Sequence, residues 1–244
     1  MKTDVSHYMN SIYLAHEGEG VHLGKPQVFV RYQGCAIGCL NCDSIDTWAF
    51  ESGGRSMSTT GVLERIERAA FGVKRVSITG GDPLHPKHRD SILDLVKELK
   101  RRRYFVNIEA SGMRIDHQIF DLIDFISFDF KTPSTGVRTP LKNLEQMMTH
   151  YPGKFQIKAV IESEHDFQAV LTAQKTVFKN LSIEESESFK ICDWCLTPAF
   201  NLNESFPLER ILNIQKWNNE QAQGFFRVII QQHKVMHGPD KKQI

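Results

Sequence analysis

The alternation of short β-rich runs with amphipathic stretches constrains the fold of this chain more than any other feature. Such alternation predicts strands joined by helical crossovers, which build a parallel sheet with helices outside it. A closed barrel of eight strands takes about 250 residues. This chain has 244 residues and offers roughly six or seven convincing strands. We therefore expect an α/β fold, a partial, open TIM-like barrel, that forms a single domain over residues 1–244. The predicted strands are 27–33, 74–79, 104–109, 124–129, 155–161, 188–192 and 225–231, and the predicted helices are 59–71, 89–102, 118–123, 141–150, 167–178 and 208–217.

The composition narrows the possible partners. A formal net charge of +1 gives no general attraction to nucleic acid or to anionic lipid. The longest apolar runs fall well short of the roughly 20 residues of a membrane span, and the one basic run, 100–103, lies at a predicted helix end, where cations favour the helix dipole. Five cysteines, an odd number, and no signal-peptide pattern indicate a reducing cytoplasm. We expect a cytoplasmic protein with neither nucleic acid nor membrane as a partner.

Three cysteines spaced C-x3-C-x2-C lie in a predicted loop, residues 34–44, directly after the first predicted strand. Thiolates of Cys35, Cys39 and Cys42 can ligate three irons of a 4Fe–4S cube, which leaves the fourth iron open to a small molecule. Two other interpretations stay open. The three cysteines could be structural, or Cys39 and Cys42 could form a zinc site with Cys192 and Cys195, although these pairs lie about 150 residues apart and zinc ribbons use roughly 15–20.

Polar residues gather at predicted strand ends, where parallel barrels carry their chemistry. Gly80-Gly81-Asp82 follows the second predicted strand; paired glycines let a ligand approach the backbone, and a carboxylate can bind an ammonium group. Glu109 lies in an apolar run, where burial is costly unless the group is bonded or functional. Asp129 and Lys131 end the fourth predicted strand. The alternative for Gly80-Gly81-Asp82 is an ordinary turn. The alternative for Asp129 and Lys131 is an ion pair on an edge strand.

The cysteine loop and the strand-end motifs together resemble those of radical S-adenosylmethionine (SAM) enzymes. The opening Glu17-Gly18-Glu19-Gly20, the strand segment Phe29-Val30-Arg31 and the tail Gln231-Gln232-His233-Lys234 narrow the resemblance to the 7-carboxy-7-deazaguanine synthase family. The likeness covers most of the chain, with few diagnostic matches in 134–224. The chain departs from the family pattern where Asn41 replaces an aromatic residue, Glu17 replaces Gln, Asp82 replaces Glu and Ala110 replaces Thr.

The resemblance implies a fold of the radical SAM type and a lyase that converts 6-carboxy-5,6,7,8-tetrahydropterin to 7-carboxy-7-deazaguanine. Ammonia is released, and the product leads to queuosine, a modified tRNA base, and to related deazapurines. A 5′-deoxyadenosyl radical made from SAM on the cluster would take hydrogen from C6 of the pterin and later return it. The resemblance also implies Mg²⁺, an electron donor of the flavodoxin or ferredoxin type, and a homodimer.

The resemblance also assigns residues to each ligand. Ser44 would hold Mg²⁺, and Arg31 could clamp the substrate carboxylate with both guanidinium arms. Glu17 could only accept hydrogen bonds as a carboxylate, unlike the family's Gln. The predicted SAM-binding residues are Asn41, Asp43, Gly80, Gly81, Asp82, Glu109, Asp129, Phe130 and Lys131, and the predicted substrate-binding residues are His16, Glu17, Gly18, Arg31 and Thr79.

Two other functions stay open on the sequence alone. One is another radical SAM enzyme, such as a glycyl-radical activase, and the other is a non-enzymatic iron–sulfur or zinc-binding module. The pair Cys192 and Cys195 is not a family hallmark, and its interpretations are a local accident, a redox pair or an auxiliary metal site.

Overall fold

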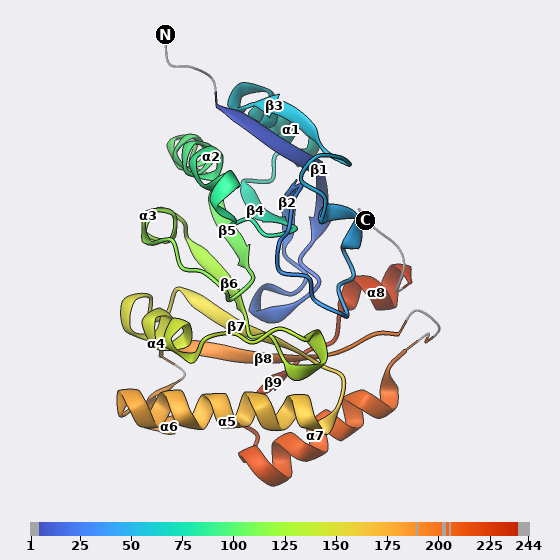
Figure 1. Ribbon diagram of the computed structural model, residues 1–244, viewed down its shortest axis with the longest axis vertical. Coiled ribbons are helices and arrows are strands. Elements are labelled where there is room, and N and C mark those ends of the chain that lie inside the picture. Colours follow the sequence, from blue (N-terminus) through green and yellow to red (C-terminus); the bar gives the residue numbers. More distant parts are fainter. Residues whose placement is uncertain (1–4, 189, 202–203, 205, 239–244) are drawn as a thin grey trace.

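A computed structural model describes residues 5–188, 190–201, 204 and 206–238. Its strands form one sheet in the order β3-β1-β2-β4-β5-β6-β7-β8-β9, in which β1 is antiparallel to β2 and β3 and every pair from β2 to β9 is parallel. The end strands β3 and β9 are not neighbours, so the barrel is open (Figure 1). The strands are β1 (Ser6–His16), β2 (Pro26–Tyr32), β3 (Arg55–Ser58), β4 (Arg75–Gly80), β5 (Phe105–Ala110), β6 (Phe125–Asp129), β7 (Phe155–Ile161), β8 (Cys192–Pro198) and β9 (Arg227–Val228).

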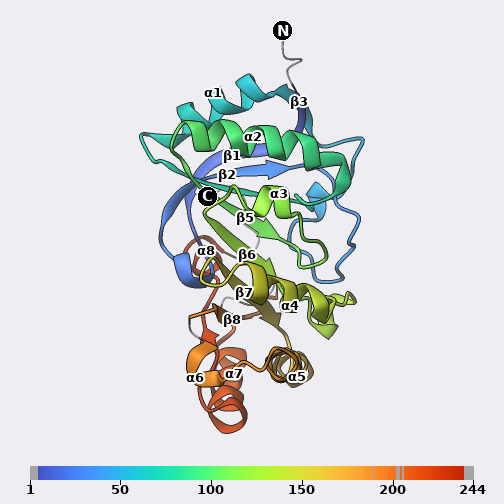
Figure 2. The ribbon, with the colours of Figure 1, turned by 90° about the vertical axis from the view of Figure 1, so that its left-hand side faces the viewer.

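The long helices that join the parallel strands follow the outer side of the curved sheet (Figures 1 and 2). Local signals set their ends: the Ser58 hydroxyl accepts from the Gly61 N–H at 3.1 Å and caps α1, and Ser163 with Asp166 forms a capping box on α5. No helix in the described part of the chain is long and apolar enough to cross a membrane. The helices are α1 (Thr59–Ala70), α2 (Arg89–Arg101), α3 (His117–Phe120), α4 (Leu141–His150), α5 (Glu164–Leu181), α6 (Glu185–Ser188), α7 (Leu208–Ala222) and α8 (Gln232–His237), with 3-10 turns η1 (Gly20–His22), η2 (Ile45–Thr47), η3 (Pro86–His88) and η4 (Pro133–Thr135).

The two faces of the sheet differ in chemistry, because successive strand residues point to opposite sides. One set is apolar and joins the hydrophobic core; it includes Val30, Ile78, Ile108, Phe128, Ile157 and Leu196. The other set is polar and hydrogen-bonded from strand to strand. Asn107 donates to Ser77 at 2.8 Å and accepts from Ser127 at 3.5 Å, and Gln156 donates to Ser127 at 2.9 Å. This polar face, called the inner face below, can receive a polar ligand.

The loop after β1 closes the end of the barrel where the parallel strands begin. Its Val21 N–H donates to Gln156 Oε1 at 2.7 Å, and the His22 ring packs edge-on against Phe125, with 4.3 Å between ring centroids. Burial and the Arg75 guanidinium lower the pKa of His22 to about 4, so its Nδ1 accepts from Arg75 Nη2 at 2.6 Å. The cysteine loop lies beyond the C-terminal end of β2, so ligands held by the cysteines approach the inner face from that end.

The parallel sheet and the open barrel are confirmed, as are the helix 141–150 and the strand 155–161. Two strand predictions are wrong. Residues 185–188 form α6, and β8 starts at Cys192 and continues to Pro198. The predicted strand 225–231 is reduced to β9, because the chain turns into α8 at Gln232. The antiparallel strand β1 was not predicted, and neither was β3.

Candidate active site

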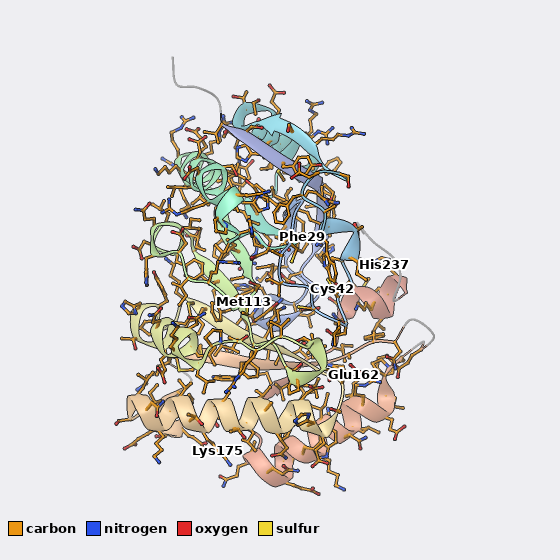
Figure 3. The ribbon with its side chains drawn as sticks, viewed as in Figure 1. Phe29, Cys42, Met113, Glu162, Lys175 and His237 are labelled. Carbon is orange, nitrogen blue, oxygen red and sulfur yellow. The ribbon has the colours of Figure 1, made fainter. Side chains whose placement is uncertain are left out.

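The cysteine loop is fixed by backbone hydrogen bonds at both ends. Cys35 N–H donates to Trp48 O at 3.0 Å, and Leu40 N–H donates to Thr135 O at 2.9 Å. Figure 3 labels Cys42 on this loop and Phe29 on the neighbouring strand β2. All three cysteines are half-buried, and burial raises the pKa of the Cys35 and Cys39 thiols. The loop thus presents three free thiols from one restrained segment.

Several N–H groups of the loop point at its sulfur atoms. The Trp48 indole N–H donates to Cys42 Sγ at 3.3 Å, the Ser44 N–H donates to the same sulfur at 3.4 Å, and the Ile37 N–H donates to Cys35 Sγ at 3.4 Å. Hydrogen bonds to sulfur stabilise thiolate and tune iron–sulfur clusters. The donor set therefore fits three thiolate ligands of a cluster. Among the described residues, no three His, Cys, Asp or Glu side chains surround a point where one metal ion would bind.

The glycine turn after β4 packs directly on the cysteine loop. A Cβ on Gly81 would lie 2.7 Å from Cys35 Cβ and 2.6 Å from Gly34 O, so only glycine permits this approach. Asp82 is fully buried beside it. Its Oδ2 accepts from Arg114 Nη1 at 2.5 Å and its Oδ1 from Ser111 Oγ at 3.2 Å. The turn therefore lies where a cluster ligand would be held, and Arg114 already pairs with the carboxylate.

The end of β6 lies next to the middle cysteine. Lys131 Nζ pairs with Asp129 Oδ2 at 2.7 Å. Phe130, the residue between them, is buried, whereas Asn41 is exposed on the cysteine loop. Burial alone would lower the pKa of Lys131, but the charge and hydrogen bond of Asp129 raise it. The pair gives this corner an acceptor and a cation within reach of the cysteines.

Charged side chains gather in the middle of the inner face. Lys158 of β7 donates to Glu109 Oε2 at 2.6 Å and to Glu19 Oε2 at 3.2 Å. Burial alone would lower the pKa of Lys158, but Glu109 and Glu19 hold it well above its usual value. Lys158 and His233 bring the pKa of Glu19 to about 2 against the opposing effect of burial. Asn107 completes the group by donating to Glu109 Oε1 at 2.8 Å.

Glu17 lies deeper, towards the closed end, and is 6% exposed. Its Oε2 accepts from Gln27 Nε2 at 2.7 Å and its Oε1 from the Glu19 N–H at 3.2 Å. Burial, with Glu109 and Glu19 adding to it, raises the pKa of Glu17 to about 7, although Lys158 and the Gln27 hydrogen bond lower it. We call Glu17, Glu19, Glu109 and Lys158 the inner charged cluster.

A second charged group lies between β2 and the cysteine loop. Arg31 Nη1 donates to Ser44 Oγ at 3.4 Å, and Nη2 donates to Tyr13 OH at 3.3 Å. Ser44 Oγ donates to Asp43 Oδ1 at 3.1 Å, and Lys234 Nζ pairs with Asp43 Oδ2 at 3.3 Å. Two cations, a hydroxyl and a carboxylate thus meet beside Cys42, a set suited to an anionic group with or without Mg²⁺.

The C-terminal segment folds back over the site (Figure 1). The Gln232 N–H donates to Gly18 O at 3.0 Å, and Gln231 Nε2 donates to Glu19 Oε1 at 2.5 Å. A Cβ on Gly18 would lie 2.1 Å from His233 Nδ1, so the His233 ring packs directly on this glycine. Of the other predicted substrate residues, Thr79 is paired in register with Arg31, whereas His16 is exposed at the end of β1.

Comparison with known proteins identifies the family. The sequence profile of the radical SAM superfamily matches residues 29–180. A 7-carboxy-7-deazaguanine synthase of Leptospira interrogans is 31% identical over 190 residues, which cover 70% of this chain and 76% of that protein. The chain belongs to the 7-carboxy-7-deazaguanine synthase family of radical SAM enzymes. The synthase of Prochlorococcus marinus is 27% identical over 232 residues, 89% of this chain and 92% of that one. The crystal structure of QueE from Escherichia coli has a TM-score of 0.69 at 21% identity and covers 93% of this chain and 95% of that one, which confirms the fold.

Membership of this family implies a 4Fe–4S cluster and SAM, and the restrained thiols with their N–H donors fit such a cluster. Two alternative interpretations are wrong: Cys192 and Cys195 cannot bind one zinc ion together with the cysteine loop, and they cannot form a redox-active disulfide. Both lie on β8 three residues apart, hence on opposite faces and roughly 10 Å apart along the strand. A disulfide needs Cα atoms within about 7 Å. Burial raises the pKa of the Cys195 thiol to about 12.

Sequence reasoning did not assign Lys158, Glu19, Gln231, His233 or Lys234 to the site. Lys158 could have been found, because it stands in the apolar strand 155–161 just as Glu109 stands in 104–109. The others carry no local signal of burial. Their contacts join residues far apart in the chain, such as Glu19 and Gln231.

Proposed function

We propose that this chain converts 6-carboxy-5,6,7,8-tetrahydropterin to 7-carboxy-7-deazaguanine and releases ammonia. One observation carries the proposal beyond family membership: the two charged groups of the site match the two ends of this substrate. The aminopyrimidinone ring of a pterin is rich in N–H donors, and Glu19 and Glu109 of the inner charged cluster offer carboxylate acceptors. The substrate carboxylate needs cations, and Arg31 and Lys234 lie together beside the cysteine loop.

The cofactors would be held between these groups and the loop. Cys35, Cys39 and Cys42 would ligate the cluster, and SAM would contact Asn41, Asp43, Gly80, Gly81, Asp82, Glu109, Asp129, Phe130 and Lys131. When bound, the cluster and SAM would supply the radical chemistry that removes hydrogen from C6 of the pterin. Ser44 would bind Mg²⁺, with the substrate carboxylate and waters completing its shell. A flavodoxin or ferredoxin would supply the electron, and the chain would act as a single-domain homodimer in the cytoplasm.

The protein's own groups would position the pterin. Arg31 would clamp the substrate carboxylate, with its second arm held by Tyr13. Glu17 and Gly18 would face the pyrimidinone ring from the closed end of the barrel. His16 would lie at the exposed edge of this end, and Thr79 would lie on the opposite side of the substrate. The loop with η1 closes the end of the barrel where the parallel strands begin, and α8 packs on Gly18 at the side of the site. Together they would keep water from the radical.

The test is turnover by anaerobically reconstituted protein given SAM, a reductant, Mg²⁺ and the carboxypterin. Formation of 7-carboxy-7-deazaguanine with one ammonia per product, followed by mass spectrometry, is the expected result. Vigorous cleavage of SAM with no pterin consumed would instead support another radical SAM reaction, such as activation of a glycyl-radical enzyme.

A further inference from the structure

Pairing within the inner charged cluster leaves one carboxyl group without a cation. The cluster contains three carboxyl groups and one ammonium, and Lys158 pairs directly with Glu109 and Glu19. The salt bridges within the described part of the chain include none to Glu17. Arg75 reaches Glu17 only through Gln27, since its Nε donates to Gln27 Oε1 at 3.0 Å.

The same contacts fix how the Glu17 carboxyl is presented. Because Arg75 can only donate, Gln27 must turn its oxygen to Arg75 and its N–H group to Glu17. Gln27 holds one carboxyl oxygen and the Glu19 N–H holds the other. An anion at this position would be buried beside two further carboxylates, which favours the protonated form.

We propose that Glu17 recognises the substrate as a neutral carboxylic acid, which donates its proton to an acceptor atom of the aminopyrimidinone ring. The inference rests on the proposed function and adds a specificity-determining group to it. A neutral carboxyl donates from one oxygen and accepts at the other, as a primary amide does. Glu17 can therefore act where the family pattern has Gln, and ligand binding becomes linked to proton binding.

The surroundings of Glu17 give the direction of this linkage. The groups that face it are Glu19 from its own loop, Arg75 of β4, Glu109 of β5 and Lys158 of β7. Burial and the neighbouring carboxylates raise the pKa of Glu17 to about 7. Below that pH the acid is present and ligand binds well. Above it, each pH unit should weaken binding by roughly tenfold, because a proton must be taken up with the ligand.

The experiment measures binding of 7-carboxy-7-deazaguanine to reconstituted holoenzyme with SAM and no reductant, by calorimetry from pH 6 to 8.5. Two buffers of different ionisation enthalpy report the protons taken up. For the wild type we expect Kd to rise roughly tenfold between pH 7.5 and 8.5, with about one proton taken up at the upper end. Glu17→Gln should bind with a Kd that does not change with pH and take up no proton. Glu64→Gln, an exposed position on α1, should keep the wild-type profile.

Binding by the wild type with no pH dependence and no proton uptake would overturn the inference while leaving the proposed function in place. A pH dependence that survives in Glu17→Gln would also overturn it, because another group would then be titrating. Failure of the wild type to bind the ligand at any pH would overturn the proposed function itself. The proton count is made on the wild type, so it decides the matter even if the variant does not fold.

Discussion

At the scale of single residues, the site is divided by charge. Carboxylates around Lys158 occupy the inner face, whereas Arg31 and Lys234 lie beside the cysteine loop. A substrate with N–H donors at one end and a carboxylate at the other can enter this field in only one orientation. Under the proposed function, this orientation would bring the substrate carboxylate towards Ser44 and the cysteine loop.

The cysteine assignment predicts separate outcomes for two sets of variants. Cys35→Ala, Cys39→Ala and Cys42→Ala should each lose the 4Fe–4S cluster and the reductive cleavage of SAM, because no other thiol shares their loop. Cys192→Ala and Cys195→Ala should keep both, since strand geometry separates these residues from each other. Iron and sulfide analysis with 5′-deoxyadenosine assays makes the check. Loss of the cluster in Cys192→Ala with retention in a triad variant would reverse the ligand assignment.

The Arg31 clamp predicts a selective loss. Arg31→Ala should keep the cluster and SAM cleavage but reduce kcat/KM for the pterin. The reduction should correspond to a loss of about 2–5 kcal/mol of transition-state stabilisation, the usual cost of removing one partner of a desolvated charge pair. Arg68→Ala, at an exposed position on α1, is the matched control and should behave as the wild type. An unchanged kcat/KM in Arg31→Ala would show that the carboxylate binds elsewhere.

The raised pKa of Glu17 also predicts a pH effect on stability. The folded chain holds this proton up to about pH 7, whereas the ordinary pKa of a glutamate is 4.5, so the free energy of unfolding falls as pH rises through this window. Glu17→Gln removes that loss. At pH 8 the variant should be more stable by up to about 3 kcal/mol, at 1.36 kcal/mol per pKa unit, and the gain should vanish near pH 4. Urea unfolding of both proteins at the two pH values tests this, and a gain of equal size at both would contradict it.

At the scale of elements, α8 ties the two charged groups together. Gln232 at its start contacts Gly18, the preceding Gln231 contacts Glu19 of the inner charged cluster, and Lys234 pairs with Asp43 on the cysteine loop. Sequence periodicity could predict the crossover strands and helices, because each buries an apolar stripe of its own. It could not predict α8, a short segment of mixed polarity whose place is set by contacts with residues more than 190 positions earlier in the chain. The motif Gln-x-His-Lys identified the tail as important without showing where it packs.

Gly18→Ala tests this element. A Cβ at that position would overlap the His233 ring and displace this side chain of α8 from its place against Gly18. We expect pterin turnover to fall at least tenfold while SAM cleavage without pterin continues, because the cysteine loop is held by other contacts. The ratio of 7-carboxy-7-deazaguanine to 5′-deoxyadenosine measures this uncoupling. A ratio equal to that of the wild type would mean that α8 does not position the substrate.

At the scale of the whole molecule, the proposed function would place cluster, SAM and substrate in sequence along the inner face of the open barrel. The cysteine loop and the glycine turn lie at the C-terminal ends of the strands, and the loop with η1 closes the other end. The family pattern allowed the polar ends to be predicted from the sequence, because each follows a strand. The inner charged cluster could not be predicted as a unit, since it joins β5, β7 and the loop after β1.

Transfer of deuterium from C6 of the carboxypterin tests the central claim most directly. If the substrate lies between the inner charged cluster and the cysteine loop, C6 faces the radical carbon. Deuterium should then appear in 5′-deoxyadenosine and in recovered SAM as 7-carboxy-7-deazaguanine forms. Product formed with no deuterium in either compound would contradict the proposed placement of the substrate.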